Sequence, residues 1–74
     1  MSEEGKFLVY CLENYKRYRH MTGRQTMELF EAYGVCDYIY EFYDVLHTTG
    51  EQYINRDIDR FLAVRHAPLP DLPA

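Results

Sequence analysis

The sequence lacks several features that define common protein classes. Its 74 residues include no tryptophan, only two cysteines, four glycines and three prolines. No apolar run approaches the roughly 20 residues that a membrane-spanning helix needs, so we expect a soluble protein without a membrane partner. The N-terminal sequence Met-Ser-Glu-Glu-Gly-Lys does not resemble a signal peptide, which favours a cytoplasmic protein.

Metal-binding and catalytic motifs are also missing. Cys11 and Cys36 have neither zinc-motif nor redox-pair spacing, and in a reducing cytoplasm two buried thiols are expected rather than a disulfide. The histidines His20, His47 and His66 are too far apart for a local zinc site. No glycine-rich loop or nucleophile motif is present. We therefore expect no cofactor, no metal and no enzymatic activity.

Basic residues are scarce in the second half of the chain. Between Glu28 and Asp59, eight acidic residues accompany a single basic residue, Arg56, and the net charge of the chain is −4. Such an acidic protein is a poor binder of nucleic acids and of anionic membranes. A short basic segment contains His20 and the basic residues Lys16, Arg17, Arg19 and Arg24. Helix-dipole complementarity at the end of the first predicted helix explains Lys16, Arg17 and Arg19.

Hydrophobic periodicity predicts four helices and no strands. They cover approximately residues 4–20, 24–33, 34–47 and a segment that begins near residue 50. The fold prediction is an all-α, compact bundle of four helices joined by short loops. We assign residues 1–66 to a single helical domain. Residues 67–74, with their prolines, are expected to form an extended or disordered tail.

Capping signals support most of these helix starts. Ser2 precedes two acidic residues, and Thr22 with Gln25 has the spacing of a capping box. Gly34 is expected to close the second helix. Asp37 is a candidate N-cap of the third helix, unless residues 35 and 36 already form its first turn.

The start of the fourth helix is left open. Thr48 with Glu51, or Thr49 with Gln52, would form a capping box for a helix that starts near Gly50. Alternatively, Asn55 would cap a helix that starts at Arg56.

The third predicted helix is the most clearly amphipathic segment. Its apolar side is expected to pack in the core and contains Val35, Ile39, Phe42, Tyr43 and Leu46. Its opposite side is acidic and carries a tyrosine. We predict that this side binds a protein partner with a basic surface, because tyrosine provides contact area and carboxylates steer association. The predicted partner-binding residues are Asp37, Tyr40, Glu41, Asp44 and His47.

The residues of this predicted site also have structural explanations. A charged His47 would complement the dipole at the end of its helix, and the polar side would otherwise be an ordinary solvated face. Eight tyrosines suit either the margins of a small core or an interface, so both a monomer and a homodimer are compatible with the sequence. Asp57 and Asp59 are flanked by Arg56 and Arg60, a mixture of signs that is typical of a solvated face, and we assign no site to them.

A nucleic-acid-binding function is the alternative. Residues 25–40 resemble a helix-turn-helix motif, with a helix, a glycine and a second helix. However, Phe30 occupies a position that requires a small residue for close helix crossing. The second helix carries Asp37, Glu41 and Asp44 and no basic residue, which would repel phosphates. Both features disfavour nucleic acid as a partner.

Short motifs follow one another along the chain. They are Phe7-Leu8, Leu29-Phe30, Tyr33-Gly34, Tyr38-Ile39, Tyr43-Asp44, Leu46-His47, Gly50 and Asp57-Ile58. The most distinctive is Tyr-Asp-Val-Leu-His at 43–47, which is followed after nine residues by Asp57-Ile58. Over residues 7–62 this order resembles a small bacterial family known only as domain of unknown function 3791.

The resemblance implies a cytoplasmic helical domain without an established activity. It designates no catalytic residue. The resemblance also implies relatives that sit near ADP-ribosyltransferase-like domains, which favours an accessory or neutralising partner over an enzyme. One candidate partner is therefore an enzyme encoded nearby. The resemblance also directs attention to Tyr43, Asp44 and His47.

Overall fold

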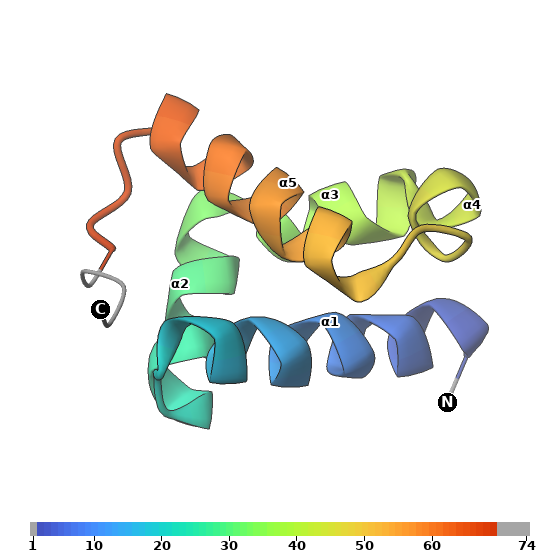
Figure 1. Cartoon of the computed structure of the whole chain (residues 1–74), viewed down its shortest axis with the longest axis horizontal. Coiled ribbons are helices and arrows are strands. Elements are labelled where there is room, and N and C mark those ends of the chain that lie inside the picture. Colours follow the sequence, from blue (N-terminus) through green and yellow to red (C-terminus); the bar gives the residue numbers. More distant parts are fainter. Residues whose placement is uncertain (1, 70–74) are drawn as a thin grey trace.

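A computed structural model describes residues 2–69 of the chain. Within these residues the chain forms five helices and no strand, which confirms the all-helical class (Figure 1). The helices are α1 (Glu3–Arg19), α2 (Gly23–Tyr33), α3 (Val35–Glu41), α4 (Tyr43–Leu46) and α5 (Glu51–Val64). In Figure 1, α1 lies along one side, α3, α4 and α5 lie on the other, and α2 connects the two sides at one end.

The first two helices begin where the sequence predicts. The Ser2 hydroxyl accepts a hydrogen bond from the Gly5 amide at 3.0 Å and so caps α1. The capping box of α2 is confirmed. The Thr22 hydroxyl accepts from the Gln25 amide at 3.1 Å, and the Gln25 side chain accepts from the Thr22 amide at 2.9 Å.

Gly34 closes α2 as predicted and leads directly into α3. Its φ of 78° lies in the left-handed region, where a side chain would strain the backbone. Because α3 begins at Val35, the prediction of Asp37 as its N-cap is wrong. The alternative, in which Val35 and Cys36 form the first turn, is correct.

The third predicted helix is not continuous. Phe42, with φ −104° and ψ 22°, separates α3 from α4, and its carbonyl oxygen accepts from the amides of both Val45 and Leu46. The prediction of one straight helix to His47 is therefore wrong, and four helices become five. The break also changes which residues face inward. Leu46 is buried as predicted, but Phe42 is 42% exposed instead of packed in the core.

The last helix starts at Glu51, directly after Gly50, which excludes the alternative start at Arg56. Neither predicted threonine cap is present. The hydroxyls of Thr48 and Thr49 instead both donate to the Val45 carbonyl at 2.9 Å, so they close the end of α4 rather than open α5.

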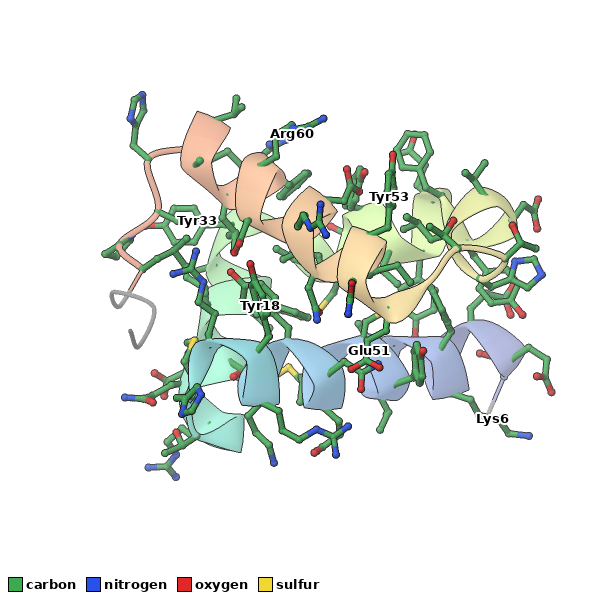
Figure 2. All side chains as sticks on the ribbon, viewed as in Figure 1. Lys6, Tyr18, Tyr33, Glu51, Tyr53 and Arg60 are labelled. Carbon is green, nitrogen blue, oxygen red and sulfur yellow. The ribbon has the colours of Figure 1, made fainter. Side chains whose placement is uncertain are left out.

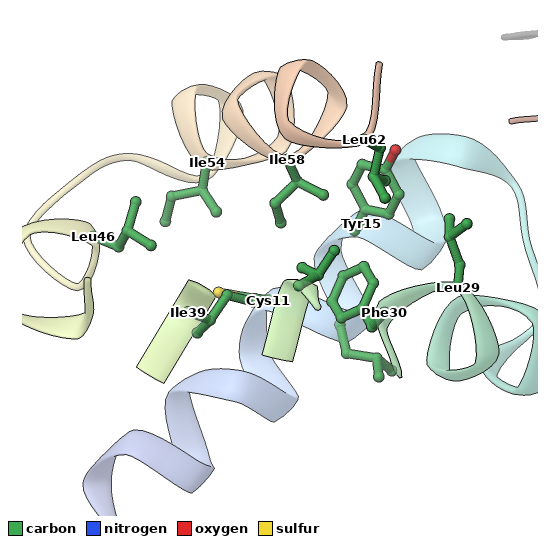
Figure 3. Packing of buried hydrophobic residues seen from close by; sticks show 11 residues of the cluster. Cys11, Tyr15, Leu29, Phe30, Ile39, Leu46, Ile54, Ile58 and Leu62 are labelled. Carbon is green, nitrogen blue, oxygen red and sulfur yellow. The ribbon is translucent and has the colours of Figure 1, made fainter. Parts of the chain in front are cut away.

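The core lies between α5 and the other helices. In Figure 3, Ile54, Ile58 and Leu62 point from α5 toward side chains of the other helices. The buried apolar residues are Cys11, Leu12, Tyr15, Leu29, Phe30, Val35, Ile39, Leu46, Ile54, Ile58 and Leu62.

The two cysteines are free thiols. Cys11 is buried as predicted, whereas Cys36 is only half-buried. Burial raises the pKa of the Cys11 thiol to about 12, because the thiolate would be poorly solvated in the core. Cys11 is therefore a core residue.

Residues 67–69 follow α5 without helical structure. The Ala67 amide donates to the Leu62 carbonyl at 3.1 Å, and Ala67 and Leu69 pack against the core. The rest of the predicted tail, residues 70–74, lies outside the described residues. None of the helices in residues 2–69 has the length and apolar character required to cross a membrane.

Candidate functional site

All five predicted site residues lie at the surface. Asp37, Tyr40 and Glu41 are on α3, Asp44 is on α4, and His47 directly follows α4. Helical spacing places Asp37, Tyr40 and Glu41 on one side of α3. Because the backbone changes direction at Phe42, the five residues do not form the single straight stripe that a continuous helix would give.

His47 has a structural role. Its Nδ1 atom lies 2.7 Å from the Tyr43 carbonyl oxygen, and its ring stacks on the Tyr43 ring with centroids 4.4 Å apart. Tyr43 in turn contacts Phe7 of α1 edge-on at 5.5 Å. Within the distinctive segment 43–47, Tyr43, Leu46 and His47 thus have packing or hydrogen-bonding partners, whereas Asp44 and Val45 are exposed.

The exposed residues of α3 and α4 define a surface that we call the α3–α4 corner. It consists of Asp37, Tyr40, Glu41, Asp44, Val45 and His47. Tyr40 is 45% exposed and Val45 is 65% exposed. Among residues 2–69, no salt bridge involves an acidic residue of this corner. The corner therefore combines uncompensated negative charge with exposed apolar area.

A second group of polar residues was missed by the sequence analysis. The Asp59 carboxylate of α5 accepts hydrogen bonds from the hydroxyls of Tyr15 at 2.5 Å and Tyr18 at 3.0 Å. It also accepts from Nε and Nη2 of Arg19, at 3.1 Å and 2.9 Å. We call these four residues the Asp59 cluster. Tyr18 projects from α1 toward α5 in Figure 2. The cluster joins α1 to α5 and is not a solvated face.

The Asp59 cluster keeps its tyrosines protonated. Burial, followed by the hydrogen bond to Asp59, raises the pKa of Tyr15, and the same causes raise the pKa of Tyr18. Both hydroxyls therefore act as hydrogen-bond donors at neutral pH. The Arg19 guanidinium supplies the positive charge that compensates the carboxylate.

Asp57 makes a matching contact on the other side of α5. Its carboxylate accepts a hydrogen bond from the Tyr38 hydroxyl of α3 at 2.5 Å. Burial and this hydrogen bond raise the pKa of Tyr38 to about 12. Asp57 and Asp59 lie about 100° to either side of the buried Ile58 on the helix, so each one meets a different neighbouring helix.

A sequence signal for these contacts existed. Acidic residues on both sides of a core residue, in a chain with eight tyrosines, indicate hydroxyl–carboxylate pairs at the margins of the core. No site was expected there because the flanking Arg56 and Arg60 suggested exposed ion pairs. Only Arg19, which is distant in the chain, forms a salt bridge to this segment within residues 2–69.

Comparisons with known proteins were consistent with the resemblance noted from the short motifs. The model of a family described as "Protein of unknown function (DUF3791)" matches residues 6–65. Neither the curated proteins nor the solved structures gave a match to this sequence. The matched region contains α2 to α5 and most of α1, including the three tyrosine–aspartate contacts. The chain therefore belongs to the DUF3791 family of proteins of unknown function.

Proposed function

We propose that this protein is a non-enzymatic interaction module whose α3–α4 corner binds a partner protein. The observation that supports this is that Tyr40 and Val45 of the consecutive helices α3 and α4 are exposed together with the acids Asp37, Glu41 and Asp44, none of which forms a salt bridge within residues 2–69. The fold does not use these side chains, in contrast to the tyrosines and aspartates of the Asp59 cluster. The module would act as an adapter or as a neutralising partner in the cytoplasm.

The chemistry of the corner favours a basic partner. A tyrosine ring provides a large contact area at a low cost in side-chain entropy, and Val45 extends this area. Carboxylates around the ring accelerate association with a positively charged surface and fix the orientation of the complex. We therefore expect binding to weaken as the salt concentration rises.

The same charges disfavour the alternative of nucleic-acid binding. In a helix-turn-helix reading, α3 would enter the major groove, but its exposed side carries Asp37 and Glu41. Phe30, at the position that would need a small residue, is fully buried. A mobility shift with mixed duplex DNA at low salt tests this alternative, because a DNA-binding protein would be retained in a steeply salt-dependent way.

The first experiment is affinity capture from the source cells at moderate salt. The test variant is Tyr40→Ala with Asp44→Ala, and the matched control is Met27→Ala with Glu31→Ala on α2. Both pairs are exposed, are four residues apart and remove one large side chain and one acid. We expect one stoichiometric partner that is captured by the wild type and the control but lost with the test variant.

The melting temperature distinguishes lost binding from lost folding. Because Tyr40 and Asp44 are exposed, their substitution should shift it by no more than a few degrees. A large loss of stability would mean that the corner supports the fold, and the proposal would be wrong. Recovery of nucleic acid, or of no other protein, would also contradict it.

A further inference from the structure

A second exposed surface lies between α3 and α5. Three rings form a row across these helices, with Tyr38 4.5 Å from Phe61 and 5.0 Å from Phe42. The Arg65 guanidinium carbon lies 3.4 Å from the centre of the Phe61 ring and covers the end of the row. We call this row of Phe42, Tyr38 and Phe61 the α3–α5 seam.

The seam continues into side chains that the monomer leaves exposed. Phe42 is 42% exposed and Tyr53 of α5 is 61% exposed. Tyr53 and Arg60 lie close enough to Tyr38 to act on it electrostatically. In Figure 2, Tyr53 and Arg60 both project from α5 on the side away from α1. The seam is thus the apolar centre of a face formed by α3 and α5.

The charges beside the seam are separated by helix. Asp37 and Glu41 are exposed on α3, and Arg56 and Arg60 are exposed on the outer side of α5, where Arg60 acts on Tyr38 of the seam and Arg56 on Tyr18 of α1. Within residues 2–69, none of these four residues forms a salt bridge. Both pairs have a spacing of four residues, and α3 and α5 run in roughly opposite directions (Figure 1). The face therefore carries a negative strip and a positive strip of equal spacing.

We propose that a second copy of this chain binds to this face and forms a twofold-symmetric homodimer. A twofold axis parallel to α3 and α5 places α3 of one copy over α5 of the other, so that acids meet arginines twice. A twofold axis that lies in the face but crosses the helices would instead place α3 over α3 and α5 over α5, so that like charges meet. The charge pattern thus identifies the second copy as the occupant and selects the orientation. Phe42 and Tyr53 then become buried at the centre.

The dimer does not depend on the proposed partner binding. Tyr40 is two residues from Phe42 and therefore points to a different side of α3. Asp37 and Glu41 border both surfaces, so a bound basic partner would compete with the second copy for them. Measurements on the purified chain alone report only on the dimer.

The test is sedimentation equilibrium of the purified full chain, whose monomer mass is 8.9 kDa. Two charge-reversed variants are used, Asp37→Lys with Glu41→Lys and Arg56→Glu with Arg60→Glu. Each one places like charges opposite each other in both symmetric contacts. We expect the dissociation constant of the homodimer to rise at least about tenfold for each variant.

An equimolar mixture of the two variants provides the decisive measurement. In the heterodimer, the introduced lysines face the introduced glutamates, and the native acids face the native arginines, so both contacts are attractive again. We expect the mixture to recover a dimer mass that neither variant reaches alone. The control, Glu28→Lys with Glu31→Lys on α2, makes the same charge change elsewhere and should leave the wild-type dimer constant unchanged.

Tyr53→Ser tests the apolar part of the face. Because the ring is largely exposed in the monomer, its removal should weaken the dimer without loss of helical content, measured by circular dichroism. The proposal is overturned if the wild type remains a monomer at all concentrations. It is also overturned if the charge reversals leave the dimer intact, or if the mixture of variants stays monomeric.

Discussion

The Asp59 cluster and the α3–α4 corner contain the same kinds of side chain but use them differently. In the cluster, one carboxylate accepts hydrogen bonds from Tyr15, Tyr18 and Arg19, and the Asp59 and Arg19 side chains are only 21% and 11% exposed. In the corner, Tyr40 and Asp44 face solvent without such partners among residues 2–69. Tyrosine next to aspartate is therefore not by itself a sign of function.

In a protein this small, exposure and the lack of hydrogen-bond partners distinguish residues that are available for binding from residues that support the fold. Side chains of the cluster lower the free energy of the fold, so their presence is explained by stability. Exposed side chains of the corner contribute little to stability and remain available for binding. Removing a carboxylate from the cluster should therefore lower the free energy of unfolding, whereas removing one from the corner should leave it nearly unchanged.

The largest effect is expected for Asp59→Ala. This change leaves the buried Tyr15 hydroxyl without its acceptor and the Arg19 guanidinium without its carboxylate. We expect a loss of about 2–3 kcal/mol, since unpaired buried donors and charges are costly. For a domain of this size, the melting temperature should fall by roughly 10–20 °C.

Asp44→Ala is the matched change in the corner. It should alter the free energy of unfolding by less than about 0.5 kcal/mol, because Asp44 is exposed. Urea denaturation of both variants measures the difference. Equal losses in the two variants would show that the corner supports the fold as much as the cluster does.

Alkaline pH should lower the free energy of unfolding, because it removes protons from tyrosines of the cluster and the seam and from the buried thiol of Cys11. Folding raises the pKa values of Tyr15, Tyr18 and Tyr38 above the ordinary value of 10.0, and that of Cys11 from 9.0 to about 12. The unfolded chain therefore releases these protons at a lower pH than the folded chain does. The stabilisation is complete below about pH 9 and is lost progressively as the pH rises toward about 12.

Urea midpoints measured between about pH 8 and about pH 11 test this prediction. We expect a continuous decrease over this range. In Tyr38→Phe the urea midpoint should fall less steeply with pH, because one of the groups with a raised pKa is then missing. A midpoint that stays constant over the range would contradict the protonated, hydrogen-bonded state of these tyrosines.

The sequence predicted the features that depend on local interactions. The capping box of Thr22 and Gln25, the closure of α2 at Gly34 and the burial of Ile54, Ile58 and Leu62 each follow from residues within a few positions. The exposure of the predicted site residues on α3 and α4 was also anticipated from helical spacing. That these residues bind a partner stays a prediction.

Features that depend on contacts between distant segments were not predicted. A helical wheel assumes one straight helix, so it could not anticipate the break at Phe42, where packing of Tyr43 against Phe7 accompanies the change in direction. Likewise, the partners of Asp59 lie 40 to 44 residues away in the chain. Such contacts become visible only once α1 and α5 are packed together.

An intermediate stability effect is expected for Tyr38→Phe, with Tyr40→Phe as its control. Tyr38→Phe removes the hydrogen bond to Asp57, but Asp57 is only half-buried and water can replace the hydroxyl. We therefore expect a loss of about 1 kcal/mol, less than for Asp59→Ala, and almost none for Tyr40→Phe. Thermal denaturation measures both variants. A loss as large as that of Asp59→Ala would contradict this expectation, because the Tyr38–Asp57 hydrogen bond would then stabilise the fold as much as the contacts of Asp59 do.

The same variant separates the two roles of Tyr38. Phenylalanine keeps the ring contacts with Phe42 and Phe61, so the apolar centre of the seam stays intact. The proposed dimer should therefore form with an unchanged dissociation constant although the monomer is less stable. If dimer formation were lost as well, the hydroxyl–carboxylate pair, and not the row of rings, would hold α3 in the position that a second copy recognises.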